Sequence, residues 1–376
     1  MAGQLISGEC APEFSKVREA FEQNFAQRNE LGAAVAVYKD GRKVVDLWGG
    51  HKDLARTVPW QQDTMVIMNS IAKSMSALCV HMLVDRGLVE FDAPVARYWP
   101  EFAQAGKEGV LVRHVLSHSC GVIFADAATP GMWFDYPAYV KAIEQQAPAW
   151  VPGMSSAYNS VNIGFILGEI VRRVTGLTVG RFLRQEISEK LGVDYFIGMR
   201  PEEIARVSDM HPNPNNDFFK QLDNPDAPLT RAFRGSPKGY FQNLPQIREG
   251  EVPSFGGHGT ARGMARIYAT LANHGSLDGV TLLSPTASQR LRWIASERAC
   301  MMTGRFTRFG FGFMHNDQDV WPMGTNPGAY GHSGSGGALA WCDPDRGLAF
   351  AYVTNFQREG NKSGPRGMAV SIAAGA

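Results

Sequence analysis

The sequence predicts an α+β fold in which strands from both ends of the chain share one sheet and a helical domain is inserted between them. Apolar, strand-like runs at 33–38 and 43–48 flank Lys39–Arg42, a turn with Asp-Gly at its centre. Helix-periodic patterns dominate from 70 to about 191, and strand patterns return over roughly the last 70 residues. This order of strands, helices and strands brings the two terminal segments together in one layer.

The remaining elements follow from local patterns. Phe14–Arg28 and Thr260–His274 have the apolar spacing of amphipathic helices. Residues 196–256 are rich in Pro, Asn, Asp and Gly, which predicts long loops. Three further segments predict strands, namely the alternation Phe309–Phe313 and the two arms of a hairpin, Ala338–Trp341 and Leu348–Val353.

The order of elements divides the chain into two expected domains. Residues 1–65 and 257–376 are expected to form a discontinuous α/β domain, and residues 66–256 a mainly helical domain with long loops. A chain of 376 residues is long enough to bury a large core, and its length alone suggests two domains.

Composition argues against several classes of function. The 37 basic and 36 acidic residues nearly cancel, so neither a nucleic acid nor an anionic membrane is indicated as a partner. The five cysteines are scattered and resemble neither a disulfide framework nor a Cys-x-x-Cys zinc site. Met1–Ser7 lacks the basic and apolar regions of a signal peptide, and no run of about 18 apolar residues spans a bilayer. We therefore expect a cytoplasmic protein that needs no cofactor and no metal.

The stretch Ser70–Lys73 carries the strongest chemical signal. It is the only Ser-x-x-Lys in the chain, and it opens an apolar, helix-periodic run. Residues i and i+3 share a helix face, so the Lys amine can lie within hydrogen-bond reach of the Ser hydroxyl. Burial in such a helix lowers the pKa of a Lys, which can then act as the base for a serine nucleophile. The alternative is that Ser70 is an N-cap and Lys73 a solvated helix residue.

Two downstream segments supply companions for this pair. Tyr158 stands just before an amphipathic run, and a phenol near an ammonium can have a lowered pKa and relay a proton to a leaving group. The quartet of His332, Ser333, Gly334 and Ser335 forms a Gly-rich edge, where one backbone N–H can serve as an oxyanion donor. The alternatives are a Tyr packed at a helix start and an ordinary Gly-rich turn.

Other candidate residues carry weaker signals. Trp133 belongs to a dense aromatic cluster at 132–136 that can line an acyl or alcohol pocket, although a core position or a loop anchor fits equally well. His114 and His118 are four apart, as in some zinc sites, but no Glu follows His114, so a structural role is favoured. The chain has no Gly-x-Ser-x-Gly, which argues against an α/β-hydrolase elbow.

In their order along the chain, these motifs resemble the signature of the serine β-lactamase and penicillin-binding-protein superfamily. That signature is Ser-x-x-Lys, then Tyr-x-Ser or Tyr-x-Asn, then a His/Lys-Ser/Thr-Gly triplet. The spacing and the segments 87–95 and 112–121 resemble its class C-like branch, and Gly257–Arg262 resembles a segment of family VIII carboxylesterases. The resemblance implies a β-lactamase-like fold: an antiparallel sheet flanked by helices, an inserted helical domain, and an active site at their junction.

Two departures from the class C pattern shift the expected substrate towards esters. Ser160 replaces the Asn that helps to hold a β-lactam amide, and His332 replaces the Lys that contacts its carboxylate. A neutral His is a weaker partner for an anion than Lys. The resemblance therefore implies hydrolysis of short-chain carboxylic esters, with a small-molecule ester as the expected partner. β-Lactamase, D-amino-acid peptidase or amidase, and acyltransferase activities are alternatives that use the same residues.

The expected mechanism is a two-step acyl transfer. Ser70 attacks the ester carbonyl, Lys73 accepts the proton with Tyr158 in its field, and the Lys73/Tyr158 pair protonates the leaving alcohol. Backbone N–H groups of Ser70 and Ser335 hold the oxyanion, and water then releases the acid. Which of Lys73 and Tyr158 is the resting base stays open, because two coupled groups titrate as a pair.

Overall fold

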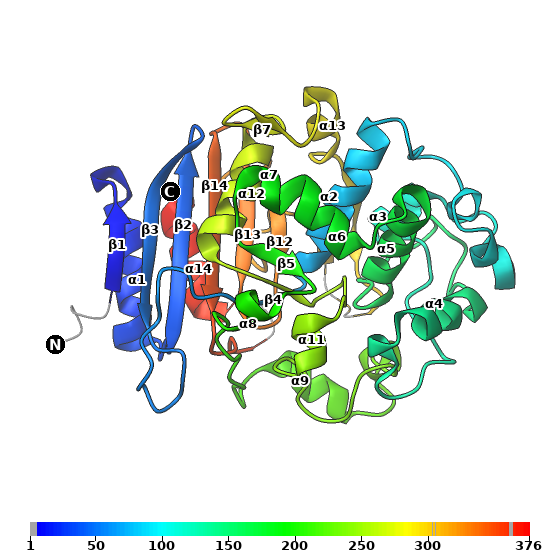
Figure 1. Ribbon diagram of the computed structural model, residues 1–376, viewed down its shortest axis with the longest axis horizontal. Coiled ribbons are helices and arrows are strands. Elements are labelled where there is room, and N and C mark those ends of the chain that lie inside the picture. The colour runs from blue at the N-terminus through cyan, green and yellow to red at the C-terminus, as the bar shows by residue number, and fades with distance from the viewer. Residues whose placement is uncertain (1–5, 303, 305, 361–363) are drawn as a thin grey trace.

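The computed structural model describes residues 6–302, 304, 306–360 and 364–376, so residues 1–5 of the N-terminal segment considered above lie outside the described residues. Its centre is a nine-stranded antiparallel sheet with the order β1-β3-β2-β14-β13-β12-β11-β10-β9 (Figure 1). The strands are β1 (Ile6–Cys10), β2 (Gly32–Lys39), β3 (Arg42–Gly50), β9 (Ile294–Ala299), β10 (Phe306–Gly310), β11 (Met314–His315), β12 (Tyr330–Ser333), β13 (Leu339–Asp343) and β14 (Leu348–Thr354). Because β14 pairs with β2, the two ends of the chain share one sheet, which confirms the predicted fold class.

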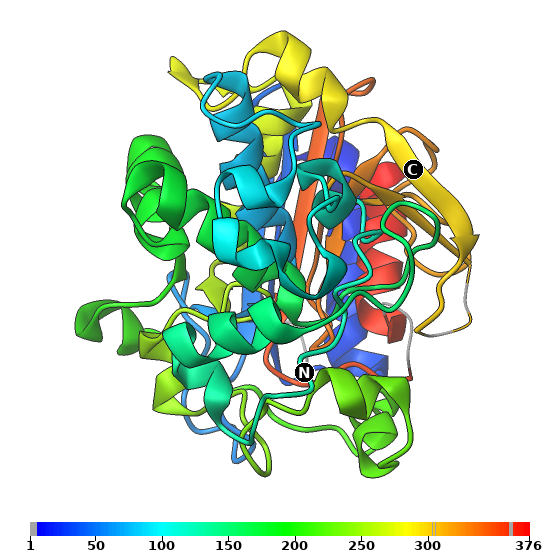
Figure 2. The ribbon, with the colours of Figure 1, turned by 90° about the vertical axis from the view of Figure 1, so that its right-hand side faces the viewer.

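Both faces of this sheet are covered by helices. In β2, Val35 and Val37 belong to a core cluster with α1 (Ser15–Gln27) and α14 (Gly364–Gly375), whereas the alternate residue Ala36 belongs to the core on the other face. Figure 2 shows α1 and α14 on one side of the sheet and the inserted helical segments on the other. Apolar residues on both faces explain why the strands read as continuous hydrophobic runs.

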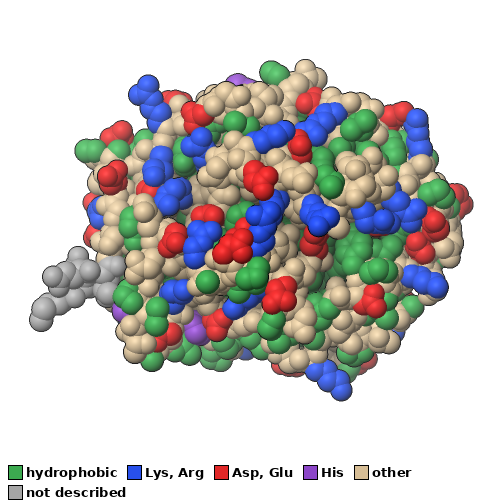
Figure 3. All heavy atoms as spheres, in the orientation of Figure 1, with side chains coloured by type: hydrophobic (Ala, Val, Ile, Leu, Met, Phe, Trp, Pro, Cys, Tyr) green, Lys and Arg blue, Asp and Glu red, His purple; other side chains and the backbone are tan. Residues whose placement is uncertain are grey.

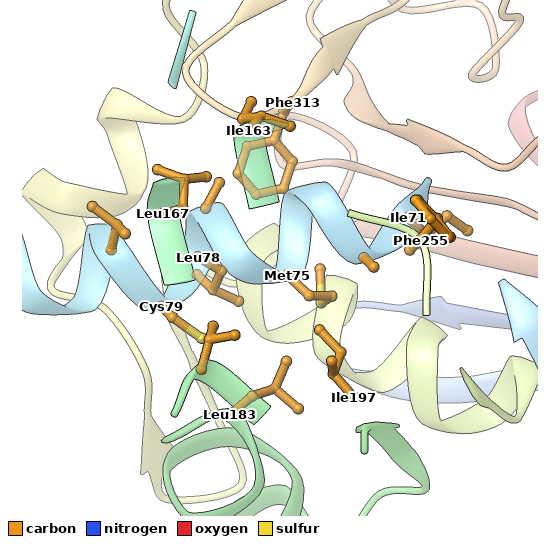
Figure 4. Close-up of a cluster of buried hydrophobic side chains, with 14 of the residues drawn as sticks. Ile71, Met75, Leu78, Cys79, Ile163, Leu167, Leu183, Ile197, Phe255 and Phe313 are labelled. Carbon is orange, nitrogen blue, oxygen red and sulfur yellow. The ribbon is translucent and has the colours of Figure 1, made fainter. Parts of the chain in front are cut away.

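The inserted region is built around one deeply buried helix, α2 (Ile71–Asp85). Its side chains are buried all round from Ile71 to Leu83. Figure 4 shows Met75, Leu78 and Cys79 of this helix packed among apolar side chains from distant segments. A helix that is apolar on every side is stable only in the interior, and any polar group on it is withdrawn from water.

Further helices follow α2 along the chain as far as residue 290 (Figure 1). They are α3 (Val112–Leu116), α4 (Tyr136–Gln145), α5 (Asn162–Thr175), α6 (Val179–Leu183), α7 (Glu189–Leu191), α8 (Pro201–Ile204), α9 (Asp217–Lys220), α10 (Pro228–Ala232), α11 (Pro245–Glu249), α12 (Ala261–Ala272) and α13 (Pro285–Arg290). The two predicted amphipathic helices, 14–28 and 260–274, correspond to α1 and α12 and are confirmed. The predicted loops at 196–256 are interrupted by the short helices α8 to α11.

A second, three-stranded sheet connects the inserted region to the rest of the chain. Its order is β4 (Val66–Asn69), β6 (Gly257–Gly259) and β5 (Tyr195–Ile197), and a two-stranded hairpin, β7 (Ser276–Leu277) with β8 (Val280–Thr281), lies elsewhere. Because β4 and β6 come from the two ends of the inserted segment, their pairing closes the insertion just before Ser70. The division into two domains at these points remains a proposal.

The prediction of one strand over Phe309–Phe313 is wrong. Strand β10 ends at Gly310, and the chain turns before β11 begins at Met314. Gly312 has a φ of 89°, and a Cβ there would lie 2.1 Å from Cβ of Ala77 on α2. The alternation of Phe and Gly therefore marks a tight turn pressed against α2, where only glycine fits, and not a pleated strand.

The charges on one face of the surface and the state of the cysteines can be compared with the expectations from composition. On the face shown in Figure 3, Lys and Arg side chains are interspersed with Asp and Glu side chains. All five cysteines lie among the described residues as free thiols, and Cys79 and Cys342 are buried as expected of small core residues. Across the described parts of the chain, no helix is both long enough and apolar enough to cross a membrane.

Candidate active site

Ser70 sits at a sharp turn between a strand and a helix. Strand β4 ends at Asn69, which has a positive φ of 49°, and α2 begins one residue after Ser70. Asn is among the few residues other than Gly that tolerate this conformation, and its side-chain oxygen accepts a hydrogen bond from Gln242 at 2.6 Å. The Ser70 N–H therefore lies at the start of the helix, among donors that no helical carbonyl can accept.

Lys73 lies one turn into α2 and is 1% exposed. Its Nζ is 3.1 Å from Oγ of Ser70 and donates to the carbonyl oxygen of Ser254 at 2.9 Å. Burial lowers the pKa of Lys73 well below its usual value, because the charged amine is removed from water and no carboxylate of the described residues offsets the loss. The structure therefore brings together a serine and a lysine that favours its neutral form, and the solvated-helix alternative for Lys73 is wrong.

Tyr158 is fixed by backbone and ring contacts on several sides. Its N–H donates to Sγ of Cys300 at 3.2 Å, and the N–H of the next residue, Asn159, donates to Nδ1 of His118 at 3.0 Å. The rings of His118 and Phe309 lie 5.3 and 6.1 Å from the Tyr158 ring. His118 thus holds the tyrosine loop, and no group of three or more potential metal ligands occurs among the described residues.

The expectation that Tyr158 has a lowered pKa is wrong. Burial raises the pKa of the Tyr158 phenol, and the Ser70 hydroxyl within hydrogen-bonding reach only partly offsets that rise. The amine of Lys73 is 5.1 Å from the centre of the phenol ring, but burial disfavours its charge as well. Desolvation therefore acts on both groups and favours the neutral form of each, the protonated phenol and the free amine.

A small, mostly apolar pocket of about 120 Å³ opens over these residues. Its polar lining includes Ser70, Tyr158, Ser160, Ser333 and Ser335, which the sequence had selected. The rest of the lining comes from Phe218, Gln221, Leu229, Met302, Phe306, Thr307, Phe309, Met314, Val320, Trp321 and Arg358. The structure thus joins motifs that are far apart in the chain around one hollow.

The quartet 332–335 leads from β12 into a tight turn before β13. The N–H of Gly334 donates to the carbonyl of Ala338 at 2.7 Å, and a Cβ at Gly334 would lie 2.4 Å from the Met68 carbonyl oxygen. The side chain of Asn216 donates to the carbonyl oxygen of Ser335 at 3.1 Å. Gly334 is therefore required for close packing against β4, and Ser335 is held at the pocket from outside the motif.

His332 and Ser160 flank Tyr158 as buried polar side chains. Nδ1 of His332 lies 2.7 Å from the carbonyl oxygen of Ser333, and a carbonyl can only accept, so this nitrogen carries the proton. Burial lowers the pKa of His332 to about 3, so the ring is neutral and its Nε2 presents a lone pair. Nε2 of His332 and Oγ of Ser160 have no hydrogen-bond partner among the described residues.

The structure does not bring Trp133 to the catalytic pocket. Its side chain is 1% exposed and packs against the rings of Phe233, Phe241 and Phe255 at 4.9 to 5.5 Å. Trp133 lies on the short turn Met132–Phe134, whose apolar side chains are drawn into the core. Of the three roles left open for this cluster, the core position is the one observed for Trp133.

Several residues of the site carried no signal in the sequence. Ser254, which accepts from Lys73, and Asn216, which supports Ser335, lie in the segment read as long loops. Phe218 and Gln221 come from the same segment, and the buried Arg358, which donates to the carbonyl of Gly360 at 3.0 Å, follows β14. Ser254 acts through its backbone carbonyl, which any residue type would supply. The other four residues come to the site only because segments far apart in the sequence fold together.

Comparison with known proteins places this geometry in a family. A family model described as Beta-lactamase matches residues 17–374. The esterase/beta-lactamase LipL of Mycobacterium tuberculosis is 33% identical over 374 residues, which cover 94% of this chain and 84% of that protein. The esterase EstB of Burkholderia gladioli is 26% identical over 96% of this chain and 94% of its own length.

Solved structures agree with this placement. A family VIII carboxylesterase superposes with a TM-score of 0.90 at 35% identity, and the match covers 98% of each chain. A penicillin-binding protein homologue from Caulobacter crescentus superposes with a TM-score of 0.88 at 38% identity, again over 98% of each chain. The β-lactamase-like fold that the motifs implied is confirmed.

Proposed function

The chain belongs to the β-lactamase family, and from this membership we propose that it is a serine carboxylesterase that cleaves short-chain esters through an acyl-enzyme. The chain is a hydrolase of the β-lactamase-like fold, and its relatives include esterases, so its fold suits an acyl-transfer reaction. The observation that carries the proposal is the distance of 3.1 Å between Nζ of the buried Lys73 and Oγ of Ser70, which lines the pocket. A serine nucleophile and its general base must lie within hydrogen-bonding distance of each other.

The first step forms the acyl-enzyme. A neutral Lys73 uses its lone pair to accept the Ser70 proton, while its remaining hydrogens are oriented by the Ser254 carbonyl at 2.9 Å. Oγ of Ser70 bonds to the ester carbon, and the carbonyl oxygen becomes an oxyanion that the N–H groups of Ser70 and Ser335 stabilise. When the oxyanion collapses and the bond from the acyl carbon to the alcohol oxygen breaks, Tyr158, kept protonated by burial, gives its proton to that oxygen and recovers one from Lys73.

The second step uses the same groups in reverse roles. A water gives one proton to Lys73 while its oxygen bonds to the acyl carbon, and the oxyanion forms again at the same two N–H groups. When the bond to Oγ of Ser70 breaks, Lys73 returns the proton to the serine. The acid leaves and the enzyme is restored, so atoms and protons balance over the cycle.

Two features favour short-chain esters over β-lactams. The pocket of about 120 Å³ is smaller than the roughly 300–1,000 Å³ typical of drug-sized ligand sites. His332, a candidate substrate-binding residue, presents a lone pair on Nε2, which repels a carboxylate where Lys would attract it. Arg358 in the pocket lining favours an anionic substrate, and β-lactam or D-amino-acid amide hydrolysis is therefore the second candidate function.

We expect p-nitrophenyl acetate and butyrate to be cleaved with a kcat/KM at least about 10³-fold above that for third-generation cephalosporins. The reason is that a site which leaves buried polar groups unpaired discriminates strongly between substrates. The measurement is a panel of p-nitrophenyl esters of increasing chain length run beside nitrocefin and a cephalosporin. Comparable values for both classes would show that Ser160 and His332 do not set the preference and would favour the second candidate.

The rate of acylation is expected to fall as the pH is lowered. Burial depresses the pKa of Lys73, so the amine is a free base above that depressed pKa and becomes protonated and inactive below it. Burial raises the pKa of Tyr158, so no loss of the donor proton is expected near neutrality. Single-turnover release of p-nitrophenol across the pH range of the intact fold measures this. A second limb that falls between neutrality and mildly alkaline pH would contradict the assignment of Tyr158 as the acid.

A further inference from the structure

A second hollow of about 800 Å³ lies beside the catalytic pocket, behind the segment of α9 and the short helix η6 (Gln221–Asp223). Phe218 and Gln221 of this segment line the catalytic pocket, whereas Phe219 and Leu222 line the second hollow. One thin wall of about two helical turns therefore separates the two spaces.

The lining of the second hollow combines aromatic rings with positively charged side chains. Phe219, Phe233, Tyr240 and Phe241 contribute aromatic rings to it, and the rings of Phe233 and Phe241 lie 5.3 and 5.5 Å from buried Trp133. Trp133, from the aromatic cluster that the sequence singled out, thus packs against two of the rings that line this hollow. Aromatic side chains fixed by other rings form a preorganised surface for a flat, apolar body.

The side chains that line the second hollow carry more positive than negative charge. Lys220, Arg234 and Lys238 contribute three cations, and Asp223 contributes the one carboxylate. Lys220 forms a long ion pair with Asp217 at 3.9 Å, and Arg234 donates to the carbonyl of Asp126, but neither Asp217 nor Asp126 belongs to the lining of the hollow. An anion of matching size gains attraction here that a neutral molecule does not.

Hydrogen bonds link this lining to both sides of the catalytic serine. Asn216, at the wall, donates to the carbonyl of Ser335. Gln357, also in the lining, donates to Gln242 at 2.9 Å, and Gln242 donates in turn to Asn69, the residue before Ser70. A ligand in the second hollow therefore contacts residues that hold both backbone segments of the proposed oxyanion site.

We propose that this hollow is an accessory binding site for an aromatic carboxylate, a molecule with a flat apolar body and one negative group, and that its occupation changes the rate of acyl transfer. The binding rests on the shape and charge of the hollow alone. The effect on rate rests on the proposed function of Ser70, because it acts through the supports of the Ser70 and Ser335 backbone.

The test uses 2-naphthoate as the probe and separates the two spaces. The catalytic pocket is blocked by reaction of Ser70 with a fluorophosphonate, and binding of 2-naphthoate is followed by calorimetry. We expect binding to persist in the blocked enzyme and to weaken about tenfold or more with neutral 2-naphthamide, with Phe219→Ala, and with Lys238→Glu. The matched control is Lys16→Glu on α1, which reverses an exposed charge far from the hollow and is expected to leave binding unchanged.

Kinetics with the intact enzyme complete the test. With p-nitrophenyl acetate as substrate, 2-naphthoate is expected to change kcat without being displaced by excess substrate, and Phe219→Ala is expected to abolish that change. Loss of binding in the blocked enzyme, or purely competitive inhibition, would place the probe in the catalytic pocket and overturn the proposal. If the fluorophosphonate fails to label Ser70, it is the proposed function that fails, and binding of 2-naphthoate to the unmodified protein still reports on the hollow.

Discussion

The Ser70→Ala protein is expected to fold normally and to lose ester hydrolysis by about 10⁴-fold or more in kcat, because a nucleophile has no substitute in a covalent mechanism. Ser70 is not needed to cap α2, since its side chain makes no capping hydrogen bond. Steady-state turnover of p-nitrophenyl acetate and the thermal unfolding midpoint measure the two effects separately.

A control for this prediction is available one turn along the same helix. Ser74 is fully buried, and its hydroxyl bonds to the Ile71 carbonyl and to the Tyr268 hydroxyl, away from the pocket. Ser74→Ala is expected to lower stability by about 1 kcal/mol and to leave kcat within threefold of the wild-type value. If Ser70→Ala behaved like Ser74→Ala after removal of any contaminating esterase, the assignment of the nucleophile would be refuted.

The sequence predicted those parts of the fold that local residue patterns determine. The turn at Lys39–Arg42 and the apolar runs on either side reproduce β2 and β3, because a two-residue Asp-Gly centre and continuous buried strands leave clear signals. The run Phe309–Phe313 failed because its alternation has the same period as a strand, while the feature that decides its structure is the contact of Gly312 with α2. A contact between segments that far apart leaves no local trace.

The site was predictable to a similar extent and for a related reason. That Ser70, Lys73 and Tyr158 lie close together could be inferred, because their motifs depend on side-chain type at a fixed spacing or order, whereas their catalytic roles are a proposal. The electrostatic state of Tyr158 could not, because it depends on how completely the surrounding fold excludes water, and burial outweighs the expected effect of a nearby ammonium. The role of Ser254 is invisible in the sequence because any residue supplies a backbone carbonyl.

Desolvation of Lys73 is therefore the physical basis of the proposed catalysis, and it comes from the core. The side chains of α2 are buried from Ile71 to Leu83, and Figure 4 shows part of the apolar surroundings, so the amine lies in a low-dielectric setting where the neutral form is favoured. The lowered pKa reduces the free energy of unfolding, because the unfolded chain binds a proton at Lys73 more readily than the native state does. The fold is accordingly expected to gain stability from this group as the pH rises towards the ordinary pKa of Lys, with the sign set by the lowered pKa in the native state.

Lys73→Arg is expected to be nearly as damaging to kcat as Lys73→Ala, with losses of about 10²-fold to 10⁴-fold in both. Arg keeps a positive charge near Ser70 but cannot be deprotonated at any working pH, so it cannot accept the serine proton. If Lys73 acted only as a positive charge, Arg would preserve much of the rate. Measuring kcat of both variants with p-nitrophenyl acetate separates the two roles.

Lys107 provides the matched control for placing Arg at a buried lysine. It is fully buried and burial lowers its pKa to about 8, but its amine donates to the carbonyls of Gln104, Glu144 and Gln146 and not to Ser70. Lys107→Arg is expected to reduce stability and to leave kcat within threefold. A Lys73→Arg enzyme within about tenfold of the wild type, equivalent to roughly 1.4 kcal/mol in the barrier, would mean that the base lies elsewhere. Tyr158 would then be the first group to test, because its oxygen is the other proton carrier within reach of Ser70.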